Sequence, residues 1–117
     1  MTDTHAPSSL TETQYDEAVR KVLGRVEQTI DAWLEDDVVD IDSARSSGML
    51  TLTLPNRTQL IINAQPPLQE IWLAAKRGGF HFRSADGERW VDTRGGDEFF
   101  ALLSSCASEQ AGKSLTF

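Results

Sequence analysis

The sequence predicts an α+β fold, a two-layer sandwich with an N-terminal and a C-terminal helix on one face of an antiparallel β-sheet of about six strands. Apolar residues recur every three or four positions over residues 11–35 and again after Gly96. Between these two segments, short alternating runs are separated by Gly, Pro, Asn and Asp, which is typical of a meander. Helices at both ends of a meander would cover one sheet face and leave the other open to water.

The length of 117 residues is enough for one hydrophobic core and too little for two. Residues 1–10 are mostly polar, contain Pro7 and show no periodicity, so we expect a disordered tail followed by one domain over residues 11–117. The tail has no apolar segment, which argues against a signal peptide and favours the cytoplasm. Cys106 is the only cysteine, so the sequence contains neither an internal disulfide nor a CxxC metal or redox motif.

The first helix is expected over residues 11–35. Ser9 and Glu12 have the spacing of a capping box, and the stripe that follows consists of Tyr15, Val19, Val22, Val26, Ile30 and Trp33. The second helix is expected after Gly95 and Gly96, with Asp97 and Glu98 in its first turn and Gly112 at its end.

The strands are expected where β-forming residues run between turn formers. The runs are Val38–Asp42, Met49–Leu54, Thr58–Asn63, Glu70–Ala75, Phe80–Arg83 and Arg89–Asp92. The breaks between them are rich in Gly, Pro, Asn and Ser, which favour turns.

The charge balance narrows the classes of partner. Eighteen Asp and Glu against eleven Lys and Arg give a net charge of -7, which disfavours binding to nucleic acid or to anionic membrane surfaces. Cations and basic protein surfaces are the expected partners.

A run of acidic residues, called here the acidic ridge, joins the first helix to the next strand. It consists of Glu27, Asp31, Glu35, Asp36, Asp37, Asp40 and Asp42, with no basic residue between them. The first three are four residues apart and lie along one helix edge, and the last two are expected on one face of the first strand. Carboxylates without nearby His or Cys suit hard metal ions, bound weakly when exposed. The alternative is a solvated surface without a ligand.

Trp72 is the second candidate for function. If Ile71 and Leu73 face the core, alternation places Glu70 and Trp72 on the open face of the sheet. An exposed Trp is typical of binding hot spots, and Asn63 and Gln65 on the preceding strand and turn would add hydrogen-bonding groups. The alternative is that a loop covers Trp72.

Other candidate catalytic groups have little support in the sequence. His81 alternates away from its Phe neighbours and shows no acidic or nucleophilic partner, and Cys106 lies on the apolar stripe of the second helix.

The run NAQPPLQEIWLAAKRGGFHF, residues 63–82, closely resembles the signature of the frataxin family, and most closely its bacterial branch, the CyaY proteins. The likeness extends over residues 11–117 and includes the ending QAG at 110–112. It implies a two-helix sandwich, weak binding of Fe²⁺ or Fe³⁺ on the acidic ridge, and association with the cysteine desulfurase and scaffold protein of iron–sulfur cluster assembly.

The resemblance matches family carboxylates to Glu27, Asp31, Asp36, Asp40 and Asp42. Gln28, Ala32 and Leu34 stand where bacterial relatives often have further acids, and the 43–48 turn is expected to be longer. Glu35 and Asp37 would compensate for the missing acids.

Three functions remain open from the sequence. The first is a non-enzymatic iron-binding module, a donor or sensor of iron that docks on the assembly complex through the ridge and through Trp72, Asn63, Gln65 and Glu70. The second is a ferroxidase or iron-storage protein, which would need a dedicated oxidation centre such as Glu-x-x-His, and the sequence has none. The third is an acidic adaptor without a metal. A monomer is expected, with oligomers on iron loading as an open alternative.

Overall fold

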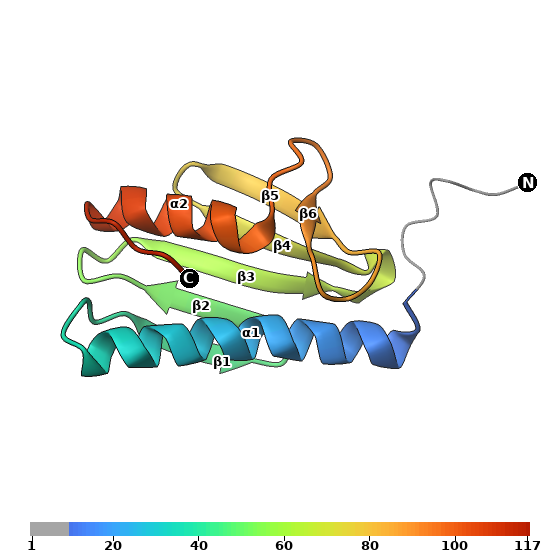
Figure 1. The fold of residues 1–117 in the computed structure, drawn as a ribbon, viewed down its shortest axis with the longest axis horizontal. Helices are drawn as coiled ribbons and strands as arrows, with labels where there is room; N and C mark the ends of the chain where they lie inside the picture. Colours follow the sequence, from blue (N-terminus) through green and yellow to red (C-terminus); the bar gives the residue numbers. More distant parts are fainter. Residues whose placement is uncertain (1–9) are drawn as a thin grey trace, which may run out of the picture.

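The computed structural model describes residues 10–117, so the expected tail lies outside the described residues except for Leu10. Helices α1 (Glu12–Glu35) and α2 (Phe99–Ala111) lie side by side on one face of a six-stranded antiparallel sheet (Figure 1). The strands follow one another across the sheet in chain order, so the sheet is a simple meander. The predicted fold class is confirmed.

The strands differ in length from centre to edge. Their bounds are β1 (Asp42–Ser46), β2 (Met49–Thr53), β3 (Gln59–Gln65), β4 (Glu70–Ala75), β5 (Gly78–Arg83) and β6 (Val91–Asp92), with a short 3₁₀ turn, η1 (Pro66–Leu68), before β4. The bounds of β4 agree with the prediction, and those of β2, β3 and β5 differ by at most two residues at either end.

The N-cap of helix α1 lies two residues later than predicted. Thr11 is the N-cap: its hydroxyl accepts from the Gln14 N–H at 3.1 Å, and the Gln14 side chain accepts from the Thr11 N–H at 2.9 Å. These two bonds form a capping box at Thr11 and Gln14, whereas the predicted pair was Ser9 and Glu12. Ser9 lies outside the described residues.

The first strand was predicted too early. Residues 38–41 form the connection after α1, and β1 starts at Asp42. The reason is the end of the helix, where Asp37 is left-handed (φ 61°) and the Val38 N–H donates to the Trp33 carbonyl at 2.8 Å. This Schellman-type turn uses the backbone groups that a strand would need. The long turn expected at 43–48 is not formed, because residues 43–46 belong to β1 and only Ser47 and Gly48 separate β1 from β2.

The core lies between the helices and one face of the sheet. Alternate residues of the central strands point inward and are fully buried: Leu50, Leu52, Leu60, Ile62, Ile71, Leu73 and Phe82. The C-terminal segment runs back between the helices (Figure 1), where Leu115 is buried and the Phe117 ring lies 4.7 Å from that of Trp33. The other face of the sheet has no covering element among the described residues, so it is open as predicted.

Helix α2 begins one residue after its predicted acidic turn. Glu98 is the N-cap, and its carboxylate accepts from the backbone N–H groups of Phe100 and Ala101. Gly112 ends the helix in the left-handed conformation (φ 70°) that favours glycine.

Candidate functional site

The acidic ridge follows the C-terminal half of α1 and the start of β1. Helix α1 and strand β1 run in opposite directions at one edge of the molecule (Figure 1), so the end of α1 and the start of β1 lie toward the same end of that edge. Asp31, Glu35, Asp36, Asp37, Asp40 and Asp42 are all exposed. Asp40 precedes the strand, so the prediction that it shares a strand face with Asp42 is wrong.

Glu27 is the ridge residue that the structure neutralises. Arg45 on β1 faces the helices and donates to the two carboxylate oxygens of Glu27, from Nη2 at 2.8 Å and from Nε at 3.2 Å. The two side chains are about one-third exposed. The other six acids have no ion pair within residues 10–117. The free part of the ridge therefore begins at Asp31.

The end of α1 concentrates negative charge where the helix dipole is already negative. Glu35, Asp36 and Asp37 occupy the last position of the helix and the two that follow, and no basic residue lies in the last turn. Lys113 from the C-terminal segment donates a hydrogen bond to the Val38 carbonyl. Negative charges crowded at this end of the helix lower the free energy of unfolding.

The ridge is an open surface without a formed metal cage. Within residues 10–117, no group of three or more His, Cys, Asp or Glu side chains lies close enough to hold a metal ion. Ion binding on the ridge therefore requires the exposed carboxylates to rotate toward a shared ion, which favours weak binding.

The second candidate surface, called here the tryptophan face, lies on the open side of the sheet. Cross-strand pairs place Asn63 beside Trp72 and Trp72 beside His81. The imidazole of His81 stacks on the Trp72 indole, with ring centroids 4.0 Å apart and planes 7° apart. No loop of the described residues covers Trp72, which is partly exposed.

Glu70 contacts the Trp72 and His81 rings and holds them in position. Its carboxylate accepts from Trp72 Nε1 at 2.8 Å and from the Arg83 guanidinium on β5, and His81 Nδ1 lies 3.9 Å away. Glu70 is on the predicted face but only 5% exposed, so it positions its neighbours and offers little contact area of its own. Gln65 pairs with Glu70 across β3 and β4.

Tyr15 connects α1 to this corner of the sheet. Its buried hydroxyl donates to the Glu70 carbonyl at 2.7 Å and accepts from the Gln65 N–H at 3.0 Å. Burial raises the pKa of Tyr15 to about 12, so the hydroxyl remains a donor in neutral solution. The tyrosine thereby anchors β3 and β4, two of the three strands that carry the tryptophan face.

His81 and Arg83 were missed as members of the site. The expectation that His81 has no acidic partner is wrong, because Glu70 is close in space although it is eleven positions earlier in the chain. The signal that could have found it is register: pairing β4 with β5 across the Lys76–Arg77 turn puts His81 opposite Trp72.

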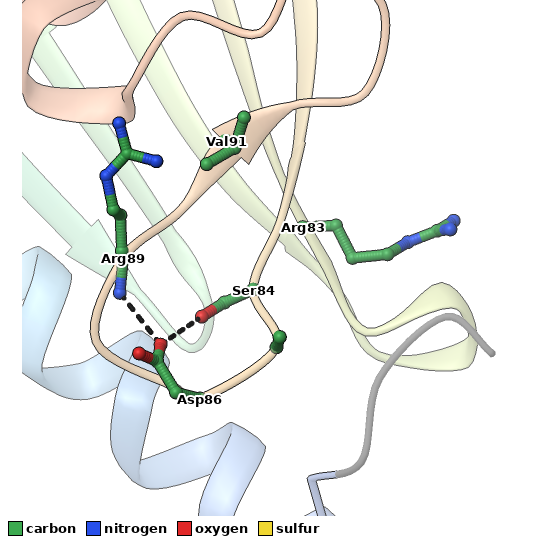
Figure 2. Close-up of a pocket in the computed structure, with 6 residues that line it drawn as sticks. Arg83, Ser84, Asp86, Arg89 and Val91 are labelled. Atoms are coloured by element: carbon green, nitrogen blue, oxygen red, sulfur yellow. Dashed lines mark hydrogen bonds between the residues drawn. The ribbon is translucent and has the colours of Figure 1, made fainter. Parts of the chain in front are cut away.

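A hollow of about 400 Å³ lies at the end of the sheet, around the turn between β5 and β6. Asp86 holds this turn by accepting from the Ser84 hydroxyl and from the backbone N–H groups of Glu88 and Arg89, and these backbone bonds lower the pKa of its carboxyl. Figure 2 shows Arg83 and Arg89 pointing away from each other and from Asp86. The described residues that line the hollow do not converge as ligands, and the Asp86 carboxylate is used in the hydrogen bonds of the turn.

Cys106 is fully buried in the core, and burial raises the pKa of its thiol. A buried thiol of this kind is a packing residue and a poor nucleophile. Over the part of the chain that the structure describes, no helix is long and apolar enough to span a membrane.

Comparison with known proteins identifies a family. A frataxin-like domain model matches residues 8–113. The iron-sulfur cluster assembly protein CyaY of Polaromonas sp. is 47% identical over 108 residues, covering 92% of each chain. The CyaY of Burkholderia mallei is also 47% identical, covering 92% of this chain and 98% of its own.

Solved structures of the same family share the fold. Frataxin from Psychromonas ingrahamii superposes with a TM-score of 0.79 at 31% identity, covering 92% of this chain and 97% of its own. Trimeric frataxin from Saccharomyces cerevisiae, complexed with ferrous iron, has a TM-score of 0.64 at 26% identity, covering 97% of this chain and 92% of its own.

Proposed function

The chain belongs to the frataxin family, and from this membership we propose that it is an iron-binding protein that assists or regulates iron–sulfur cluster assembly. In this proposal residues 11–117 act as one domain in the cytoplasm. The domain docks on the cysteine desulfurase and scaffold protein and serves as a donor or a sensor of iron.

The observation that carries the proposal is the set of six exposed acids, from Asp31 to Asp42, that form no ion pair with any other residue of the range 10–117. Oxygen ligands without His or Cys suit hard cations such as iron and disfavour zinc and copper. Weak, exposed binding is compatible with an ion that is delivered or sensed, since a transferred ion must also leave. A ferrous complex of a yeast relative supports iron as the ion.

The ridge also supports docking on a basic surface. Unpaired negative charge on one side of the molecule raises the association rate with a positively charged partner. Trp72, with Asn63 and Gln65 beside it in the sheet, would supply the contact that holds the complex once formed.

The proposal is tested with two variants matched in charge. One is Asp36→Asn, Asp40→Asn and Asp42→Asn on the ridge, and the control is Glu12→Gln, Asp16→Asn and Glu17→Gln at the other end of α1. Both remove three exposed acids.

We expect the ridge variant to lose most of the thermal stabilisation by iron and to bind the purified desulfurase–scaffold complex more slowly, whereas the control keeps both properties. Equal behaviour of the two variants would show that net charge, and not the ridge, is what matters. Oxygen consumption with ferrous iron, measured against buffer, distinguishes the proposed binder from a ferroxidase, which would show a saturable rate.

A further inference from the structure

Resting on the proposed docking role, we propose that the tryptophan face receives an acidic surface of its partner, and that protonation of His81 strengthens this contact. The inference concerns a second docking surface, with a charge opposite to that of the acidic ridge.

The tryptophan face presents no free negative charge. Cross-strand register places Glu70 as the only acid on the open side of β4, β5 and β6 in the described chain, because Asp92 pairs with Phe82 and therefore faces the helices. Glu70 is 5% exposed and is bound to Arg83 and to Trp72 Nε1. The negative charge of Glu70 is therefore balanced within the protein by the Arg83 guanidinium.

Arg83 and Glu70 offset each other, so Arg94, near β5, adds a positive charge that no acid on the open side of β4, β5 and β6 offsets in the described chain. The Arg83 side chain is 36% exposed, and its buried Nε has no acceptor among the residues that the structure describes. Arg94, just beyond β6, reaches back to the Gly79 carbonyl on β5 at 3.4 Å and is exposed. The His81 side chain is 41% exposed. A surface with these groups around one aromatic platform complements carboxylates.

The two docking surfaces lie at opposite edges of the sheet. The ridge ends on β1, whereas the positive groups lie on β5 and just after β6, and the sheet order runs from β1 to β6. A basic partner surface that suits the ridge would be repelled at the tryptophan face. Charge complementarity therefore favours an acidic partner surface there.

His81 makes this contact dependent on pH. The groups around His81 come from three segments: Glu70 and Trp72 on β4, Arg83 on β5, and Thr93 and Arg94 after β6. The Thr93 N–H donates to the His81 carbonyl at 2.9 Å. Histidine gains a proton between about pH 8 and pH 5. Protonation adds one positive charge to the centre of the face, which attracts an acidic partner more strongly.

The test measures affinity for the purified desulfurase–scaffold complex at about pH 8 and about pH 6. Wild type should bind about two- to fivefold tighter at the lower pH than His81→Gln does, since an exposed charge pair changes affinity by about that factor. His81→Gln keeps a planar polar side chain and should remove this part of the pH dependence. Arg94→Gln should weaken binding at both pH values, and Arg20→Gln on α1 is its charge-matched control.

The possible results separate the claims. Equal slopes for wild type and His81→Gln, or equal affinities for Arg94→Gln and Arg20→Gln, would overturn this inference and leave the proposed function standing. Weaker binding at low pH that depends on His81 would indicate a basic partner surface and also overturn it. A dimer of this chain that depends on His81 in sedimentation would assign the face to a second copy, against the inference. Failure of wild type to bind at either pH would overturn both.

Discussion

Asp37 provides a direct way to measure what the end of the ridge costs in stability. It is left-handed (φ 61°) at the position after the C-cap of α1, where glycine is the favoured residue. A left-handed conformation costs a residue other than glycine about 1–2 kcal/mol. Glycine also makes the unfolded chain more flexible, which lowers the free energy of unfolding by about 0.4–1 kcal/mol. Removing an acid from a helix C-terminus raises the free energy of unfolding by about 0.3–1 kcal/mol.

Asp37→Gly should therefore raise the free energy of unfolding by about 1–2 kcal/mol, or several degrees in melting temperature. Asp37→Asn removes the charge and keeps a side chain that tolerates the left-handed conformation, so it should gain only about 0.3–1 kcal/mol. Urea and thermal unfolding at low salt and at about 1 M salt separate the two parts, because salt screens the charge and leaves the backbone term. If Asp37→Gly is less stable than wild type at both salt concentrations, the reasoning about this end of the ridge is wrong.

Three further predictions concern the fold around the two surfaces. Trp72→Ala should lower the free energy of unfolding by only about 1–2 kcal/mol while weakening partner binding, whereas Trp90→Ala in the core should cost about 3–5 kcal/mol; similar losses in thermal melts would make Trp72 a core residue. Gly24→Ala should stabilise the protein by about 0.5–1 kcal/mol in urea unfolding, because no atom of another described element lies within 4 Å of the added methyl group; a loss of stability would reveal a contact that the structure does not show. Tyr15→Phe should cost about 1–3 kcal/mol. Because the folded-state pKa of Tyr15 is raised from 10.0 to about 12, wild type should lose stability as the pH rises between these values, and Tyr15→Phe should lack that loss; the same alkaline loss in both proteins would contradict the assignment.

The central sheet could be predicted from sequence because its pattern is unambiguous. In β4 a buried Ile71 and Leu73 alternate with Trp72, and flanking turn formers define both ends. The strand β1 could not be found in this way, since all five of its residues are exposed and polar or small. It is a strand because β2 supplies its hydrogen bonds, and the apolar Val38 and Val39 misled the prediction.

The candidate site could likewise be predicted only where the signal lies within one segment of the sequence. The acids of the ridge are visible in the sequence as a run, but the neutralisation of Glu27 by Arg45 depends on the register of β1 against α1. Trp72 follows from alternation within one strand, whereas its contacts with His81 and Glu70 depend on the pairing of two strands. Single-strand periodicity does not contain that information.

The most direct test of the account is residue-resolved line broadening of backbone amide NMR signals by Fe²⁺ in the absence of oxygen. A paramagnetic ion broadens the signals of the groups nearest to it, so the pattern locates the site. We expect broadening between Asp31 and Asp42, and its loss in the variant with Asp36→Asn, Asp40→Asn and Asp42→Asn. Broadening confined to another part of the chain, or none at millimolar Fe²⁺, would contradict the claim that the ridge is the iron-binding surface.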